Sequence, residues 1–267
     1  MVIDFHTHAF PDALAERAIG GLVANMEPSS PFAPSTNGTL AGLLARMDAD
    51  GVDKSVLLPV VTKPNQTLRL NEWAAGAASE RVIPFGGMYP STGTYRQDID
   101  LIVSLGLRGI KLHCEYQNFV VDDAWVLPIY DYALSRGLTL VFHSGYDPSF
   151  PEPFKSSPQR FRNVWDAMRG GTIVVAHLGG FNAWDDTERY IVGTGLYMDT
   201  STGFAHFPTE QFLRIVRNHG ADKVLFATDS PWSRADEELA ALRALSLSDE
   251  ERELILHGNA ERLLGLV

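Results

Sequence analysis

Residues 139–143 read TLVFH and residues 172–177 read TIVVAH. Each stretch is apolar and rich in β-branched side chains until its last residue, which is a histidine. Parallel strands that are covered on both faces read as near-continuous apolar runs of this kind. Residues 144–171 lie between the two stretches and are long enough for a loop and a helix. The pattern therefore predicts two parallel strands joined by a helical crossover.

The same pattern recurs along the whole chain. The expected strands are Val2–His8, Lys54–Leu58, Val82–Met88, Gly109–His113, Thr139–His143, Thr172–His177, Leu196–Asp199 and Val224–Asp229. Eight strands that alternate with helices favour a closed barrel over an open sheet. A doubly wound sheet is the alternative, but no glycine-rich phosphate loop follows the first strand. We predict an α/β fold, a (β/α)8 TIM barrel, formed as a single domain by residues 1–267.

Three of the intervening helices have recognisable ends. Apolar residues recur at helical spacing after Thr39, which is suited to be an N-cap, and this helix ends near Gly51. A second helix ends at Gly137, and a third begins at Pro208 and stops at Gly220.

Two segments are longer than ordinary connections. They are Gly20–Gly38, which contains EPSSPFAPSTNG, and Ser144–Pro158, which reads SGYDPSFPEPFKSSP. Both follow strand ends on the side where a barrel of this type builds its active site. We interpret them either as lids and pocket walls or as plain surface loops.

Composition narrows the class of protein. The chain has 267 residues and a formal net charge of −11, so its average surface repels nucleic acid. Its one cysteine, Cys114, excludes an intrachain disulfide and suits a reducing compartment. The start MVIDFHTH does not read as a signal peptide, and no apolar run approaches the roughly 20 residues that span a membrane. We expect a cytoplasmic protein that binds neither nucleic acid nor membranes.

Polar residues close several of the predicted strands. His6 and His8 close the first strand and lie on one face of it, because side chains alternate along a strand. His143, His177 and Asp229 close the fifth, sixth and eighth strands. Such groups are costly to bury without partners. Imidazoles and a carboxylate suit a divalent metal, zinc above all, with manganese, iron or nickel as alternatives.

The sequence also resembles a known family. The motifs that carry the resemblance are IDFHTH, MDADGV, GIKLHCEYQNF, LVFHSG, VVAHLGG, MDTS, LFATDSPW and HGNAERLLGL, which together cover nearly the whole chain. They are similar to the amidohydrolase superfamily, specifically to the amidohydrolase-related group that includes aminocarboxymuconate semialdehyde decarboxylase-like proteins. The resemblance implies a (β/α)8 fold, a metal on His6, His8, His143 and Asp229, and a catalytic role for His177.

The fourth strand departs from the family pattern. Several relatives have proline where this chain has Cys114, which we interpret as a packing residue. Because side chains alternate along a strand, Lys111 and His113 lie on the same face of the fourth strand. In binuclear relatives a lysine of this strand is carboxylated and bridges two metals. We expect one metal, with Lys111 as a polar neighbour or substrate contact, and a second metal through Lys111 as the alternative.

These parts suit metal-assisted hydrolysis of an amide, ester or lactone. Asp229 can be both metal ligand and general base, and His177 can polarise the substrate or return a proton. Non-oxidative decarboxylation of an aromatic or unsaturated carboxylate is the alternative. It ranks second because the only candidates for an arginine that binds the substrate carboxylate are Arg46 and Arg234. The expected substrate-binding residues are Lys111, His113, Gln117, Tyr146 and Trp232.

Two further classes of function receive less support from the sequence. A Schiff-base aldolase with Lys111 as nucleophile leaves the histidines and Asp229 without a purpose. A non-enzymatic metal-binding protein leaves His177 unexplained. No organic cofactor is required, and the expected partner is a small-molecule substrate. A homodimer is compatible with the resemblance, although no stripe of residues marks an interface.

Overall fold

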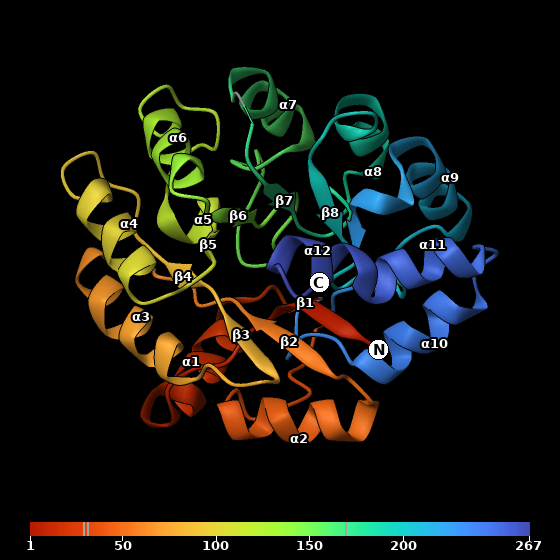
Figure 1. The fold of residues 1–267 in the computed structure, drawn as a ribbon, viewed down its shortest axis with the longest axis horizontal. Coiled ribbons are helices and arrows are strands. Elements are labelled where there is room, and N and C mark those ends of the chain that lie inside the picture. Colours follow the sequence, from red (N-terminus) through yellow and green to blue (C-terminus); the bar gives the residue numbers. More distant parts are fainter. Residues whose placement is uncertain (29, 31, 169) are drawn as a thin grey trace.

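The computed structural model describes residues 1–28, 30, 32–168 and 170–267. Its strands stand in a ring surrounded by helices (Figure 1). The strands are β1 (Ile3–Thr7), β2 (Lys54–Leu57), β3 (Val82–Pro84), β4 (Gly86–Gly87), β5 (Gly109–Leu112), β6 (Thr139–Phe142), β7 (Ile173–Val175), β8 (Tyr197–Asp199) and β9 (Val224–Leu225). Every predicted strand is present. The hydrogen-bonded ladders stop short of the polar residues that end most of the predicted segments.

The ladders form two parallel runs that make eight strand positions. The orders are β1-β2-β3 and β4-β5-β6-β7-β8-β9. Only Phe85 separates β3 from β4, and its backbone N–H donates to the carbonyl oxygen of Leu57 on β2 at 2.9 Å. The segment from 82 to 87 is therefore one interrupted strand, as the sequence predicts.

Backbone hydrogen bonds join the first strand to the last. The N–H of Phe5 donates to the carbonyl oxygen of Phe226 at 2.9 Å, and the N–H of Asp229 donates to that of His6 at 2.8 Å. These bonds lie just beyond the short ladder of β9 and close the ring. The predicted (β/α)8 barrel is confirmed.

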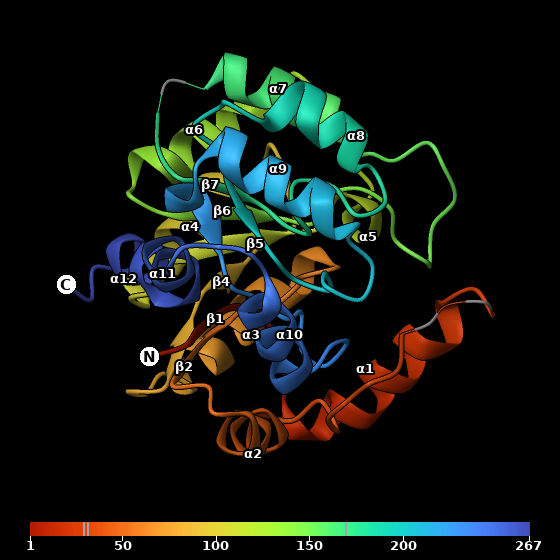
Figure 2. The same cartoon turned by 90° about the vertical axis from the view of Figure 1, so that its right-hand side faces the viewer.

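Helices pack around the ring on its outer side (Figures 1 and 2). They are α1 (Asp12–Asn25), α2 (Leu40–Asp50), α3 (Thr67–Gly76), α4 (Tyr95–Ser104), α5 (Cys114–Gln117), α6 (Leu127–Ser135), α7 (Pro158–Ala167), α8 (Trp184–Asp186), α9 (Thr209–His219), α10 (Ala235–Ala244), α11 (Asp249–Glu253) and α12 (Asn259–Leu264). Short 3-10 or π turns are η1 (Pro64–Gln66), η2 (Thr187–Ile191), η3 (Ala221–Lys223) and η4 (Leu254–Gly258). No helix in the described part of the chain is long and apolar enough to cross a membrane.

The predicted ends of two helices are confirmed, and the helix expected to end at Gly137, α6, ends two residues earlier at Ser135. The Thr39 side chain accepts the N–H of Gly42 and caps α2, and Gly51 ends that helix in the left-handed conformation with φ 74°. Helix α9 begins after Pro208 and ends at Gly220.

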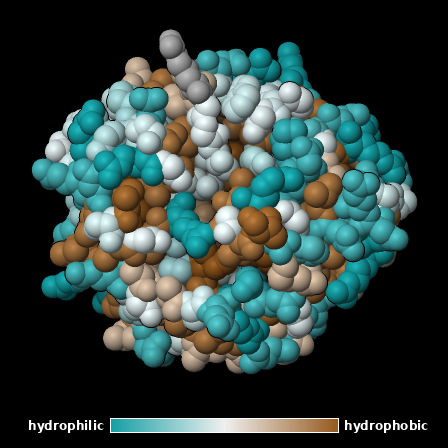
Figure 3. Space-filling model, viewed as in Figure 1, coloured by the Kyte–Doolittle hydropathy of each residue, from teal (hydrophilic) through white to brown (hydrophobic). Residues whose placement is uncertain are grey.

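Apolar side chains fill the barrel and the layer outside it. The smaller core cluster joins residues of β1, β2, β6, β7 and β9 to Ala260 and Leu264 of α12. In Figure 1, α12 lies over the centre of the ring. The larger cluster packs the outer faces of the strands against the helices and includes Cys114, as the packing interpretation expects. Figure 3 shows the molecule from the same side as Figure 1. Hydrophilic residues lie around the rim of this face, with smaller apolar patches between them.

The two long segments differ from each other. The expected loop Gly20–Gly38 is partly wrong, because α1 continues through Gly20 to Asn25 and projects from the barrel (Figure 2). Residues 29 and 31 of that segment lie outside the described residues. The loop Ser144–Pro158 is confirmed up to the start of α7. The two segments meet where the N–H of Glu27 donates to the carbonyl oxygen of Pro148 at 3.0 Å.

Candidate metal centre

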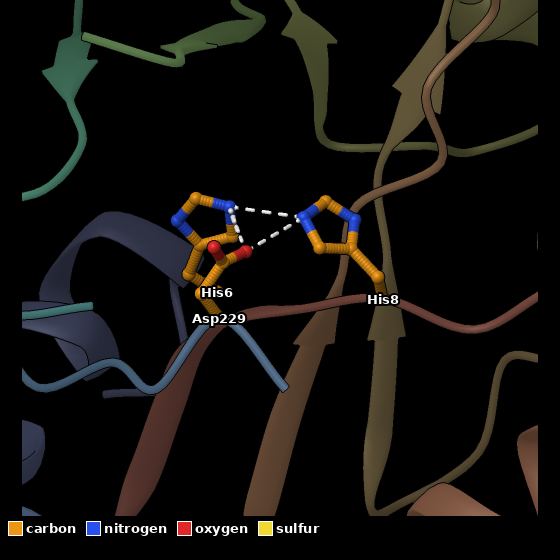
Figure 4. Close-up of side chains that lie close together, drawn as sticks. All are labelled: His6, His8 and Asp229. Atoms are coloured by element: carbon orange, nitrogen blue, oxygen red, sulfur yellow. Dashed lines mark hydrogen bonds and ion pairs between the residues drawn. The ribbon is translucent and has the colours of Figure 1, made fainter. Parts of the chain in front are cut away.

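The side chains of His6, His8 and Asp229 converge (Figure 4). His6 lies in β1, His8 follows that strand, and Asp229 follows β9. Nε2 of His6 lies 3.2 Å from Nε2 of His8. Oδ1 of Asp229 lies 3.2 Å from the first nitrogen and 3.0 Å from the second. We call these three residues the triad.

The outer nitrogens of the two imidazoles fix their tautomers. Nδ1 of His6 lies 2.9 Å from a carboxylate oxygen of Asp199, and Nδ1 of His8 lies 2.6 Å from the carbonyl oxygen of Leu58. Both partners are acceptors, so each Nδ1 carries the hydrogen of a neutral imidazole. Each Nε2 therefore turns a lone pair towards Asp229. Two lone pairs and a carboxylate oxygen face one another, and Nζ of Lys111 donates to the lone pair of His6 at 2.8 Å.

Such a group of acceptors fits a divalent cation. A zinc ion lies about 2.0–2.2 Å from nitrogen and oxygen ligands, which places ligands about 3.0–3.5 Å apart at right-angled to tetrahedral bond angles. The separations within the triad, from 3.0 to 3.2 Å, fall in this range. The triad can hold a metal once the ammonium group of Lys111 moves off the lone pair of His6.

Lys111 lies directly against the triad. Its Nζ is 2.8 Å from Nε2 of His6, and the side chain is fully buried. Burial lowers the pKa of Lys111 to about 8, against the pull of Asp229 and Asp199. Burial and the neighbouring Lys111 together lower the pKa of His6 to about 4. The lysine is therefore a polar neighbour of the triad, as the sequence predicts.

The backbone is unusual at the ends of these strands. Asp229 has φ 63° and His177 has φ 58°, a left-handed conformation that few residues other than glycine adopt. Each costs on the order of 1–3 kcal/mol, and such strain gathers at functional sites. The β1–β2 register also shifts between Asp4 and Thr7, next to His6. Irregularities of this kind re-aim side chains.

His177 lies beside the triad within a polar network. Its Nδ1 is 2.8 Å from the Ser201 hydroxyl, and its Nε2 is 3.0 Å from Nδ1 of His143. Burial lowers the pKa of His177, so its imidazole is neutral at pH 7. The side chain is 3% exposed, so it meets a substrate only at the floor of the site.

The structure does not bring His143 into the triad. A nitrogen of its ring instead lies within 4.8 Å of donor atoms of His113 and Asp147. The rings of His113 and His143 stack with centroids 4.2 Å apart. The four ligands implied by the resemblance are thus divided between two groups of side chains.

The expected substrate-binding residues have different surroundings. Gln117 is buried, and its amide nitrogen donates to the carbonyl oxygens of Val61 and Met88. Gln117 therefore connects the segments that follow two strands. Both of its amide hydrogens are bonded to the backbone, so neither is available to a substrate. Tyr146 is partly exposed and donates its hydroxyl to Glu27. Trp232 is partly exposed in the turn after Asp229.

The two arginines considered as carboxylate clamps have acidic partners of their own. Arg46 pairs with Asp50 on α2. Arg234 pairs with Asp236, with the Nη2–Oδ2 distance at 2.5 Å. Both guanidinium groups are already neutralised, which weakens them as clamps for a substrate carboxylate.

A family model described as Amidohydrolase matches residues 3–266. The chain belongs to this amidohydrolase family. No curated protein matches the sequence.

Solved structures agree with the fold of the chain. An uncharacterised TIM-barrel protein from Bordetella bronchiseptica has a TM-score of 0.81 at 20% identity, over 99% of this chain and 98% of that chain. 5-Carboxyvanillate decarboxylase from Sphingomonas paucimobilis has a TM-score of 0.71 at 15% identity, over 98% of each chain. A probable 2-pyrone-4,6-dicarboxylic acid hydrolase from Acinetobacter baumannii has a TM-score of 0.66 at 16% identity, over 99% of each chain. At such identities the likeness establishes the fold alone.

One residue that supports the triad, Asp199, was not predicted from the sequence. Asp199 is fully buried and holds Nδ1 of His6, while its other oxygen accepts the N–H of His177. Burial opposes its ionisation, but His6 outweighs this and holds the pKa of Asp199 well below its usual range. The signal was available, because the predicted strand Leu196–Asp199 ends in a carboxylate as Val224–Asp229 does.

Proposed function

We propose that the protein is a metal-dependent hydrolase that activates water against an amide, ester or lactone of a small organic molecule. The observation that carries the proposal is the triad, in which two imidazole nitrogens and a carboxylate oxygen converge at 3.0–3.2 Å from one another. A divalent cation bound there would supply the Lewis acidity that lowers the pKa of water towards neutrality. We favour one zinc ion in the triad, because nitrogen and oxygen donors suit it.

Asp229 is proposed as ligand and general base. Its Oδ1 belongs to the triad, which leaves Oδ2 to accept the proton of the attacking water. Burial disfavours its ionised form, but its charged and polar neighbours outweigh burial and hold the pKa of Asp229 well below its usual range. The carboxylate is therefore ionised at neutral pH, as a metal ligand must be.

His177 is proposed as the residue that passes a proton to the leaving group. The imidazole is neutral, and Ser201 holds its Nδ1, so Nε2 is the nitrogen that can take up a proton. Nε2 lies on the side of His143, within the same polar floor. A proton taken up there can be returned as the substrate bond breaks.

Decarboxylation is the second candidate. Lys111 favours it, because a buried cation beside His6 could pair with a substrate carboxylate. The acidic partners of Arg46 and Arg234 count against it. We therefore retain hydrolysis as the first reading of the site.

The test combines metal content with turnover. The protein would be purified without chelator, and zinc per chain would be measured for the wild type, His8→Ala and His177→Ala. We expect His8→Ala to lose one equivalent of metal together with activity, and His177→Ala to keep the metal but lose turnover. His257→Ala serves as the control, because His257 pairs with Glu261 near the C-terminus.

The substrate panel would contain esters, lactones and aromatic carboxylates. Release of carbon dioxide from a carboxylate, with no hydrolysis of any ester or lactone, would replace the first candidate by the second. A His177→Ala variant that stays fully active on every accepted substrate would remove His177 from the mechanism. Unchanged metal content in His8→Ala would remove the triad.

A further inference from the structure

We propose that Phe181 and His206 form a wall of the substrate site beside His177, and that His206 gives the substrate a hydrogen bond there. Phe181 lies in the loop after β7, and His206 lies in the loop after β8. The inference rests on the proposed hydrolysis and adds a substrate class. The group of the ester, amide or lactone that faces this wall is apolar, bears a hydroxyl or carbonyl group, and carries no carboxylate.

The ring of Phe181 lies against both histidines. Its centroid is 6.1 Å from that of His177 and 5.3 Å from that of His206, and both pairs meet edge to face. The loop after β6 holds Phe181 in place. The N–H of Phe181 donates to the carbonyl oxygen of Ser144 at 2.9 Å, and its carbonyl oxygen accepts the N–H of Tyr146 at 3.0 Å. One fixed ring therefore connects His206 to the polar floor of the site.

The loop after β8 is anchored on both sides of His206. At its start, the Ser201 hydroxyl lies 2.8 Å from Nδ1 of His177. At its end, Phe207 is buried and its ring lies 5.0 Å from that of Trp184, centroid to centroid. The fold therefore sets the position of His206 relative to His177.

The imidazole of His206 has hydrogen-bonding capacity that the protein does not use. Its ring is half-buried and lies 5.3 Å from that of Phe181 and 5.4 Å from that of Phe32. No hydrogen bond joins it to another described residue. The other histidines of the described part of the chain each have a polar partner: His6, His8, His113, His143, His177, His219 and His257. Burial lowers the pKa of His206, so the neutral ring offers a ligand one donor and one acceptor.

The charges around this wall disfavour a substrate carboxylate. The two loops that carry the wall, residues 178–183 and 200–207, contain no lysine or arginine. Tyr146 stacks on Phe181 with planes 23° apart, and its hydroxyl donates to the carboxylate of Glu27. A second carboxylate among these rings would lose water without gaining a cation. A hydroxyl or carbonyl group needs only the hydrogen bond that His206 can supply.

The binding of three ketones tests the wall without turnover. Phenylacetone, 4-hydroxyphenylacetone and 4-carboxyphenylacetone have a CH2 group in place of the ester oxygen of an aryl acetate, so they cannot be hydrolysed. Their rings suit a wall of aromatic side chains. Calorimetry on protein purified without chelator would give each Kd for the wild type, His206→Phe and His206→Gln. His257→Phe is the matched control, because His257 pairs with Glu261 near the C-terminus.

We expect the wild type to bind the hydroxyl ketone about 2- to 10-fold more tightly than phenylacetone, as one net hydrogen bond allows. The carboxylate should bind more weakly than either. His206→Phe should lose the preference for the hydroxyl group and keep its affinity for phenylacetone. His206→Gln should retain the preference, because an amide also donates and accepts. The control should bind all three ketones as the wild type does.

Other outcomes overturn the wall. They are an equal hydroxyl preference in the wild type and His206→Phe, a carboxylate bound as tightly as the hydroxyl ketone, and no binding of any ketone to the wild type. His206→Leu replaces His206→Phe if that variant does not fold.

The matching aryl acetates separate this inference from the proposed function. Ketone binding as expected, without turnover of any ester, amide or lactone, removes the hydrolysis and leaves the wall as a binding surface. Hydrolysis of 4-hydroxyphenyl acetate with the same KM in the wild type and His206→Phe keeps the proposed function and removes the wall. A raised KM with unchanged kcat in His206→Phe supports both.

Discussion

Replacement of Asp199 by asparagine tests how the triad is held. Oδ2 of Asp199 lies 2.9 Å from Nδ1 of His6, and Oδ1 accepts the backbone N–H of His177 at 3.0 Å. Asparagine keeps one acceptor and adds an NH2 donor in place of the other. Whichever way the amide turns, one buried donor faces another donor.

The effect of Asp199→Asn on metal affinity or stability depends on which donor loses its acceptor, Nδ1–H of His6 or the backbone N–H of His177. If the amide NH2 faces His6, the ring either turns away or moves its hydrogen to Nε2, where it blocks the lone pair that faces Asp229. Loss of such a supporting carboxylate lowers metal affinity about 10–100-fold, or about 1.4–2.7 kcal/mol. If the NH2 faces the N–H of His177, the unsatisfied donor costs about 1–3 kcal/mol of folding free energy instead.

Competition with a chromophoric chelator measures the affinity. The wild-type protein serves as the background. Urea unfolding of the metal-free protein measures the folding term. Glu238→Gln is the matched control, because Glu238 is a buried carboxylate that accepts the N–H of Phe204 away from the triad. An Asp199→Asn variant whose zinc affinity and unfolding free energy both equal those of its background would refute the argument.

Two other predictions concern stability. Burial raises the pKa of Glu238 above its ordinary 4.5, so the unfolded chain releases this proton at lower pH than the folded chain. The stability that protonated Glu238 gives is complete below about pH 4.5 and is lost as the pH rises through the folded pKa. The difference in unfolding free energy between wild type and Glu238→Gln should therefore change with pH. Gln117→Leu should destabilise the fold by about 1–3 kcal/mol, because two buried carbonyl oxygens and the N–H of His113 lose their partner. Equal urea midpoints for Gln117→Leu and wild type would restore Gln117 as a candidate for substrate contact.

The barrel could be predicted from the sequence because its strands are buried on both faces. An apolar run such as TLVFH can form few structures other than a covered strand, and its polar end marks the edge where side chains meet. Gly20 and Gly21 misled the prediction, because glycine is a weak helix former and usually marks a loop. In the structure both lie within α1, between the alanine, leucine and isoleucine residues that favour a helix.

The grouping of the site residues could not be predicted in the same way. Strand alternation places His6 and His8 on one face, but it does not say which carboxylate meets which imidazole. Asp147 belongs to a loop, and loop conformation has no periodic signal in the sequence. The division of His143 from the triad therefore appears only when the side chains are placed in space.

Asp199 connects the two groups of ligands. One of its oxygens fixes the tautomer of His6, and the other accepts the hydroxyl hydrogen of Ser201, which in turn fixes His177 and then His143. Each step follows because a hydroxyl has one hydrogen and a neutral imidazole has one donor and one acceptor. A single ionised carboxylate at the end of β8 thus directs a lone pair of His6 into the triad. The same carboxylate, through Ser201 and His177, leaves Nε2 of His143 without a hydrogen-bond partner in the described part of the chain.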